Sequence, residues 1–410
     1  MRVNDFKLEV FFDEHEFSTP YLLAQSDCQS RTVAELLSLE PGSEARLADT
    51  RLGYTEAAGS EELRSSVAAL YRGMGSHNVL THCGAEEAIF AYLNVVLSAG
   101  DEVIVLTPTY QSLSEIPRAI GAKPVPWRLR NRIGEQNGQA ASGAIGAWYA
   151  DFDELETLIS PLTRLIIVNT PNNPTGYTLT ADEIDKLVAI AARHNLAILA
   201  DEVYRGLTLD GLARPALVEV YDKAVSLGVM SKAYGLAGLR IGWLVGADTA
   251  LLARVQKYKH YLSICNSVTS EFLAGIALRN GERIIADNVD IISGNVALAE
   301  RFFVRHGDKF INNPPQSGSV AFHRLTDAYA AEMADALQAG LDGRAAADST
   351  QPYSLIELYC RYLAKAAGVL LLPGSTYDVN EPYFRMGYGR ADFADALAVL
   401  DRFLSNGSVE

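Results

Sequence analysis

The sequence predicts an α/β fold in which a large domain, built on a mostly parallel sheet between helices, precedes a smaller α+β domain. At 410 residues the chain exceeds the usual size of one domain. Apolar, β-branched runs within 101–112, 164–180 and 195–207 alternate with helical patterns, which is typical of parallel strands buried on both faces. We therefore expect an N-terminal arm over 1–45, a large domain over 46–270 and a small domain over 271–410.

The small domain is predicted from the alternation of helices with short strands in the last third of the chain. We expect helices over 296–305, 327–341 and 391–405, and strands over 318–323, 367–372 and 383–388. The stretch 342–356 resembles a loop without recognisable chemistry. In the arm, turn signals dominate, and we expect one short helix over 32–37.

Composition and charge narrow the class of protein. The formal net charge of −15 argues against nucleic acid or an anionic membrane as a partner. No apolar run has the length of a signal peptide core or a membrane span, so we expect a cytoplasmic protein. The cysteines, at positions 28, 83, 265 and 360, show neither pairing nor metal-ligand spacing, and the histidines form no cluster. We expect no metal.

The segment MSKAYGLAGLRIGW, residues 230–243, carries the strongest chemical signal. Lys232 follows an apolar run and has small or apolar neighbours, an unusual setting for a surface lysine. A desolvated lysine has a lowered pKa and can act as an amine nucleophile in Schiff-base chemistry. Arg240, eight residues downstream among glycines, offers the planar donor fork that suits a phosphate. An amine beside a phosphate clamp suggests pyridoxal phosphate.

Polar residues close two of the apolar strands. Asn173 lies between Pro171 and Pro174, where its amide can donate to a ligand oxygen at the sheet edge. Asp201 ends the next strand, and a carboxylate there needs a cation, such as a protonated pyridine nitrogen or the partner of a structural salt bridge. We expect the neighbouring Glu202 on the solvated side.

These motifs, in this order, resemble the fold-type I aminotransferases of class I/II, and the resemblance covers about residues 50–400. The shared features are Lys232 with Arg240, the NNPTG motif, the Asp-x-x-Tyr spacing and the arginine of YFRMGYG. The resemblance implies a seven-stranded type of sheet and pyridoxal 5′-phosphate as cofactor. It further implies that Asn173 and Tyr204 hold the phenolic oxygen of the cofactor and that Asp201 pairs with the ring nitrogen. Arg385, whose fork suits a carboxylate, then binds the substrate α-carboxylate.

Further cofactor contacts are expected from helix starts and strand ends. Gly84, Ala85 and Glu86 open a helix, where outward-pointing amides favour a phosphate. Tyr110 follows a strand terminus and, as the family's aromatic residue at this place, stacks on the pyridine; core packing is the alternative. Tyr54 belongs to a Y-x4-G-x3-LR segment whose tyrosine reaches the phosphate of the neighbouring subunit, which implies a homodimer. Core packing is again the alternative.

The match departs from the family pattern in two places. Val229 stands where many relatives carry a phosphate-binding serine, and Ser231 is the adjacent hydroxyl. The arm lacks the usual glycine turn and instead has LLAQSDCQS. Ser26 and Asp27 in this segment are predicted near the substrate carboxylate, with a helix N-cap as the alternative.

The basic cluster Lys257, Lys259 and His260 is interpreted as a wet helix face, with binding of a substrate side-chain carboxylate as the alternative.

We predict an aminotransferase that moves an amino group between an α-amino acid and a 2-oxo acid through a Schiff base on Lys232. A lyase or decarboxylase on the same fold is the alternative, because no motif reports which α-carbon bond is broken. A regulator with an aminotransferase-like domain is disfavoured, because no basic helix-turn-helix segment precedes residue 50. The sequence does not specify the amino donor or acceptor.

Overall fold

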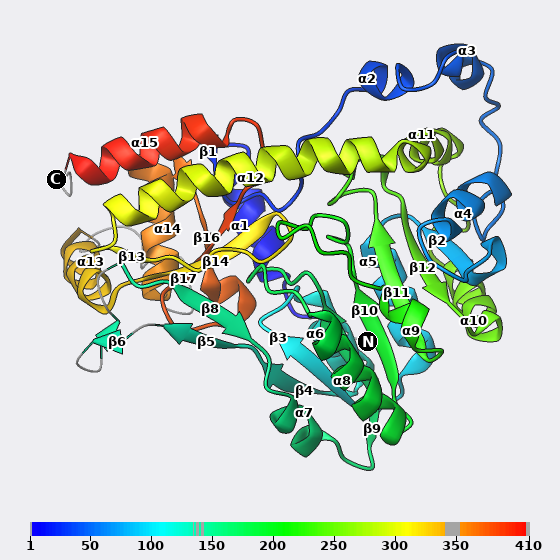
Figure 1. The fold of residues 1–410 in the computed structure, drawn as a ribbon, viewed down its shortest axis with the longest axis horizontal. Coiled ribbons are helices and arrows are strands. Elements are labelled where there is room, and N and C mark those ends of the chain that lie inside the picture. Colours follow the sequence, from blue (N-terminus) through cyan, green and yellow to red (C-terminus); the bar gives the residue numbers. More distant parts are fainter. Residues whose placement is uncertain (1, 134, 137–138, 141–142, 341–352, 407–410) are drawn as a thin grey trace.

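The computed structural model describes residues 2–133, 135–136, 139–140, 143–340 and 353–406. Its centre is a seven-stranded sheet with the strand order β2-β12-β11-β10-β9-β3-β4. In that order, the strands span Val79–His82, Gly242–Gly246, Ala224–Val229, Ala197–Asp201, Thr163–Asn169, Glu102–Thr107 and Lys123–Arg128. The five strands from β11 to β4 pair in parallel, whereas β12 is antiparallel to both of its neighbours. The predicted mostly parallel sheet is confirmed (Figure 1).

Helices cover this sheet because each carries an apolar stripe that needs a partner. On one side α5 packs against α6 and α10, and elsewhere α7 packs against α8. The helices of this part are α4 (Glu61–Ala68), α5 (Ala85–Val96), α6 (Ser112–Ile120), α7 (Phe152–Leu158), α8 (Ala181–Arg193), α9 (Leu217–Val220), α10 (Thr249–Lys259) and α11 (Val268–Arg279). A hairpin of β5 (Arg130–Ile133) and β8 (Gly146–Tyr149) extends from the sheet.

A second, antiparallel sheet with the order β13-β14-β17-β16 lies in the C-terminal third. Its strands are Phe310–Ile311, Val320–Leu325, Tyr383–Gly387 and Leu372–Pro373, and its helices are α13 (Asp327–Gly340), α14 (Leu355–Ala366) and α15 (Phe393–Ser405). The predicted helices and strands are therefore present, with shifted ends. Residues 342–352 of the predicted loop lie outside the described residues, and Leu355 and Ile356 belong to α14.

The helix predicted from residue 296 is much longer than expected. Helix α12 spans Gly281–Arg305 and runs from the large sheet to the small one (Figure 1). Its buried face includes Asn288 and Asn295, which interrupt the apolar periodicity that would have revealed its first half. Both amides are satisfied, because Asn288 donates to the carbonyl of Ala233 and Asn295 to that of Tyr388, each at 2.9 Å.

The N-terminal arm contains an unexpected helix, α1 (Lys7–His15), besides α2 (Val33–Leu37) and α3 (Ser43–Ala48). No side chain caps α1 at its start, so it lacks the usual sequence signal, whereas Thr32 forms a capping box for the predicted α2. Strand β1 (Tyr21–Leu22) pairs in parallel with β15 (Val369–Leu370). The segment with α2 and α3 projects from the body (Figure 1). The domain boundaries at 45 and 270 stay predictions. Among the described helices, none has the length and apolarity to cross a membrane.

The interpretation of the basic cluster as a wet face is wrong for Lys259. This side chain has no exposed surface and ends α10, with Lys257 and His260 exposed beside it. Its Nζ donates to the carbonyl oxygens of Ala57 and Thr81 at 2.8 Å and to Asn266 Oδ1 at 3.1 Å. A buried ammonium is tolerated here because three acceptors surround it.

Replacing Lys259 with methionine is expected to destabilise the protein by about 3 kcal/mol or more, because the carbonyls of Ala57 and Thr81 would remain buried without a donor. Lys257→Met on the exposed face of the same helix is the matched control and should stay within about 0.5 kcal/mol. Denaturant unfolding followed by circular dichroism measures both. Equal stabilities of the two variants would contradict the role assigned to Lys259.

Candidate active site

A cavity of about 440 Å³ lies at the carboxyl ends of β9, β10 and β11. Ligands of open α/β sheets bind at this edge, because the strands end there and the following loops converge. Most of the predicted site residues line the cavity: Ser26, Asp27, Ala85, Glu86, Tyr110, Asn173, Asp201, Tyr204, Ser231, Lys232, Arg240 and Arg385. They come from the arm, from the large sheet and from β17, which are far apart in the sequence.

Lys232 lies in the turn after β11 and is only partly exposed. Its Nζ donates a hydrogen bond to the hydroxyl of Ser26 at 2.8 Å. Burial lowers the pKa of the Lys232 ammonium below its usual range. A lowered pKa favours the neutral, nucleophilic amine, and Lys232 holds only one hydrogen bond among the described residues, whereas Lys259 holds three.

Asp201 ends β10 and is 3% exposed. Its carboxylate accepts a hydrogen bond from the backbone amide of Val203 at 3.3 Å, and no Lys, Arg or His nitrogen of the described chain lies within 4.0 Å. Burial therefore raises the pKa of Asp201 to about 7, despite the charge of Lys232 nearby. This carboxylate lacks the cationic partner that its position requires.

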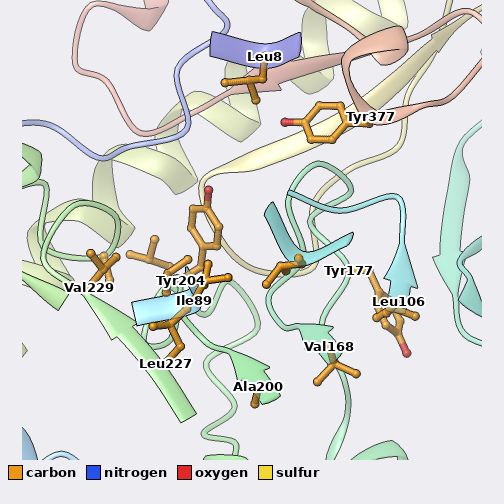
Figure 2. Packing of buried hydrophobic residues seen from close by; sticks show 14 of the residues in the cluster. Leu8, Ile89, Leu106, Val168, Tyr177, Ala200, Tyr204, Leu227, Val229 and Tyr377 are labelled. Carbon is orange, nitrogen blue, oxygen red and sulfur yellow. The ribbon is translucent and has the colours of Figure 1, made fainter. Parts of the chain in front are cut away.

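Tyr204 lies in the turn that follows β10, and 1% of its surface is exposed. Its hydroxyl is buried without a hydrogen-bond partner among the described residues. Figure 2 shows this hydroxyl pointing away from Ala200 and Leu227, toward the region between Leu8 and Tyr377. Burial raises the pKa of Tyr204 well above its usual range, so the hydroxyl keeps its proton and can donate to a ligand.

Arg385 on β17 is 1% exposed and meets only neutral acceptors. Its Nη1 donates to Asn173 Oδ1 at 3.0 Å and to the hydroxyl of Tyr377 at 2.5 Å. Its Nε and Nη2 donate to the carbonyl of Ala24 at 3.2 and 2.5 Å. These contacts fix the guanidinium without neutralising its charge, which leaves it available for an anion. Tyr377, which also donates to Asn173 Oδ1 at 2.7 Å, was not predicted.

The start of α5 forms a second anion-binding feature. Gly84 is the N-cap with φ 93°, and a Cβ at this position would lie 2.5 Å from Nη2 of Arg240. Arg240 itself adopts a left-handed backbone with φ 51°, and its Nη1 is 3.5 Å from the Ser231 hydroxyl. The helix start, the guanidinium and the hydroxyl can together surround a phosphate. Val229 ends β11, is buried and supplies no hydroxyl.

Three predicted site residues have other surroundings. Tyr54 is 88% exposed and does not line this cavity, so within one chain it is neither core filler nor a cofactor contact. Asp27 lines the cavity but binds Arg390, with contacts of 2.9 and 3.2 Å. Tyr110 lines the cavity with its ring 5.1 Å from that of Phe6.

The expectation that Glu202 is solvated is wrong. Glu202 is 5% exposed, and its Oε1 accepts the backbone amide of Leu217 at 2.8 Å. Burial raises its pKa to about 7. Glu202 directly follows β10, and helix α9, which packs on the neighbouring strand β11, covers it through the amide of Leu217.

The cavity has lining residues that sequence reasoning missed, namely Glu9, Phe12, Glu16 and Gln25 from the arm and Arg390 from the segment after β17. Glu9 and Phe12 lie on α1 and Glu16 directly follows it; the missing cap concealed this helix. The arm segment after β1 was recognised as unusual, but no local pattern in it reported that Gln25 faces the cavity.

The residues of the cavity fit the ring nitrogen, the phenolic oxygen, the phosphate and the aldehyde of pyridoxal phosphate. Asp201 needs a cation such as a protonated ring nitrogen, Tyr204 needs an acceptor such as the phenolic oxygen, and the start of α5 beside Arg240 needs an anion. Lys232 offers the amine on the same side. This arrangement, on a seven-stranded mixed sheet, defines a fold-type I pyridoxal phosphate enzyme.

Comparisons with known proteins agree with this assignment. The family "Aminotransferase class I and II" matches residues 20–399. Capreomycidine synthase from Streptomyces vinaceus is 30% identical over 323 residues, 78% of this chain and 79% of that protein. A PLP-dependent aminotransferase from Streptococcus suis shares 30% identity and a TM-score of 0.83, with both chains covered completely. The chain therefore belongs to the class I and II aminotransferase family, and pyridoxal 5′-phosphate is its cofactor.

Two further results bear on the reaction. The structure of the PLP-dependent cyclase OrfR is similar with a TM-score of 0.83, 26% identity and coverage of 100% of this chain and 99% of that one. Curated relatives named as aspartate, kynurenine–oxoglutarate and arginine–pyruvate transaminases align over only about half of their own length. The family assignment thus leaves the substrate to be argued from the site.

The stability of the cofactor-free protein should depend on the protonation of Asp201. The folded protein raises the pKa of this carboxyl from 3.8 to about 7, so it binds a proton more tightly than the unfolded chain. The free energy of unfolding of the cofactor-free protein therefore falls as the pH rises from about 4 to 7 and stays low above 7. Asp201→Asn should stabilise the cofactor-free protein at pH 8 by roughly 2–4 kcal/mol and change little near pH 4.5.

Denaturant unfolding of cofactor-free wild type and Asp201→Asn at both pH values measures this difference. Asp13→Asn, an exposed substitution on α1, controls for the general effect of removing a negative charge. A wild type that is as stable as Asp201→Asn at pH 8 would show that the carboxylate is not desolvated as the structure indicates.

Proposed function

We propose that this enzyme transfers the amino group of an α-amino acid to a 2-oxo acid, with Lys232 as the attachment site of the cofactor through a Schiff base. The observation that carries the proposal is that Lys232, Asp201 and Arg385 line one cavity, although they come from two different sheets. The first two suit the cofactor, and the third is a fixed, uncompensated cation that suits the substrate α-carboxylate.

Bound pyridoxal phosphate supplies an aldehyde that condenses with amines and a ring that accepts electrons from the substrate α-carbon. In this proposal Asp201 keeps the ring nitrogen protonated, while Tyr204 and Asn173 hold the phenolic oxygen. Arg240, Ser231 and the amides of Gly84, Ala85 and Glu86 hold the phosphate. Tyr110 stacks on the ring face.

Arg385 orients the substrate by its α-carboxylate, and Tyr377 and Asn173 keep the guanidinium in place. With the cofactor bound, the Nζ of Lys232 would accept the proton from the substrate α-carbon and later give it back. Its lowered pKa favours the neutral amine that accepts this proton. The hydroxyl of Ser26, 2.8 Å from Nζ, holds the amine in the cavity.

A cyclase or lyase reaction is the second candidate, supported by the similarity to the cyclase OrfR over the whole chain. Both reactions begin with removal of the α-proton by Lys232, so the residues above serve either one. The products separate them, because transamination yields a 2-oxo acid and a new amino acid from the acceptor.

The activity test combines amino donors with pyruvate or 2-oxoglutarate and quantifies the new amino acid by chromatography. Wild type should form it, whereas Lys232→Ala should lose activity by about 10³-fold or more, because the proton acceptor is gone. Borohydride treatment of the holoenzyme should fix the cofactor on Lys232, as mass spectrometry of peptides would show. Formation of a cyclised or eliminated product without amino transfer would replace this proposal by the second candidate.

We also propose a homodimer with shared active sites and a cytoplasmic location. Tyr54 supports the dimer, because an aromatic side chain that is 88% exposed gains from burial against a partner. The four cysteines are all unpaired, as is usual in a reducing compartment, and cell fractionation would test the location.

The dimer predicts complementation between two impaired variants. Tyr54→Ala should damage the site of the partner subunit, and Lys232→Ala should damage its own site. After subunit exchange, heterodimers contain one intact site, so the mixture should recover up to about a quarter of wild-type activity. Analytical ultracentrifugation checks the oligomeric state. A fully active monomer, or a mixture without recovery despite exchange, would contradict shared sites.

A further inference from the structure

The charges that line the active-site cavity can be divided by the roles proposed above. The cations are Lys232, Arg240, Arg385 and Arg390. The first three serve the cofactor and the substrate α-carboxylate. Arg390 holds Asp27 by two contacts of 2.9 and 3.2 Å, so its charge is already compensated. No cation among the described lining residues is left for a second carboxylate of the substrate.

The remaining lining charges are carboxyl groups. Asp201 serves the ring nitrogen, and Glu86 accepts a hydrogen bond from the Ser112 hydroxyl at the start of α5, where burial raises the pKa of its carboxyl. Glu9 and Glu16 are left, and both lie on or just after α1 at the mouth of the cavity. Lys7 of α1 pairs with Asp378, and Arg361 pairs with Glu14 of the same helix, so these two cations compensate neither Glu9 nor Glu16.

Gln25 supplies an independent sign of a missing hydrogen-bond donor. This side chain lines the same cavity and is 6% exposed. Its Nε2 donates to Glu16 Oε1 at 3.0 Å, and its Oε1 is buried without a partner among the described residues. A buried carbonyl oxygen without a donor costs free energy, which a ligand that brings N–H groups would recover.

We propose that the amino donor of this enzyme carries a cationic side chain, an ammonium or guanidinium group, which Glu9, Glu16 and Gln25 recognise from the N-terminal arm. The inference rests on the proposed function, because it uses Arg385 as the anchor of the α-carboxylate. Carboxylates and an amide oxygen are the acceptors that such a side chain requires.

The position of α1 suits this role. Phe12 lies beside Arg385, whose Cζ is 6.0 Å from the ring centroid, so the helix runs past the point where the α-carboxylate is held. The aliphatic part of the donor side chain can pack on this ring, with its charged end at Glu9 and Glu16. Glu9 is an exposed residue, but partial burial of its carboxyl raises its pKa, as do the charges of Glu16 and Asp13. The charges of Lys232 and Arg385 act in the opposite direction, which places Glu9 within their electrostatic reach.

The test compares ornithine, norvaline and glutamate as amino donors of the holoenzyme. Ornithine and norvaline have the same carbon chain and differ only in the terminal ammonium group, whereas glutamate carries a carboxylate. Wild type should use ornithine with a kcat/KM at least about tenfold above those of the other two. Glu9→Gln should lower the value for ornithine by about 10–100-fold and leave that for norvaline within about twofold.

Asp13→Asn is the matched control, because it removes the same charge from the same helix at a residue that does not line the cavity. Asp13→Asn should change the kcat/KM for ornithine and for norvaline by no more than about twofold. Gln25→Leu, like Glu9→Gln, should lower the kcat/KM for ornithine and leave that for norvaline nearly unchanged. Equal use of ornithine and norvaline by wild type, a preference for glutamate, or an equal loss for both donors in Glu9→Gln would overturn the inference.

Calorimetric binding of α-methylornithine and 2-methylnorvaline to the holoenzyme gives a readout without turnover, because neither compound has an α-hydrogen. Tighter binding of the cationic analogue, lost in Glu9→Gln, supports the inference even when no donor is transaminated. In that case the proposed reaction fails and the recognition stands. In the opposite case, the enzyme transfers amino groups but norvaline is its best donor. The proposed reaction then stands and the proposed recognition fails.

Discussion

The buried carboxylate of Asp201 is the constraint around which the site is arranged. It ends β10 in the middle of the sheet, is 3% exposed and, among the described residues, accepts a hydrogen bond from the amide of Val203. A group in that position has a raised pKa unless a cation arrives, and the cavity above it is the place where a cation can enter. The buried carboxylate thus destabilises the cofactor-free protein, and a protonated ring nitrogen would offset this cost. The fold loses stability at this position in favour of cofactor binding.

Two lysines show how environment separates structure from chemistry. Lys259 has no exposed surface and gives its protons to three acceptors, which hold the segments around Ala57, Thr81 and Asn266 together. Lys232 has one neutral acceptor, Ser26, and opens into a cavity. Burial lowers the pKa of both ammonium groups, but only Lys232 can reach a ligand. The number of acceptors and the access to the cavity, rather than burial alone, distinguish the two roles.

Arg385 connects three parts of the chain at the substrate end. Its guanidinium contacts Asn173 after β9, Tyr377 before β17 and the carbonyl of Ala24 in the arm. The large sheet, the small sheet and the arm therefore meet at one fixed cation. Helix α1 lies at the same place, so the arm contributes both to the position of Arg385 and, with Glu9 and Glu16, to the charge that lines the cavity.

The sequence by itself determined the mostly parallel sheet, because apolar runs and the residues that end them are local signals. Its resemblance to the class I/II aminotransferases then predicted that Asn173, Asp201, Tyr204, Lys232 and Arg240 share one site. The tertiary structure decided the rest. Helix α1 lacks a cap, α12 buries asparagines, and Glu202 and Lys259 are polar residues whose burial depends on partners far along the chain. Whether Glu9 or Gln25 faces the cavity likewise depends on how the arm packs against two sheets. Long-range packing sets the partners of a polar group, and no local pattern records it.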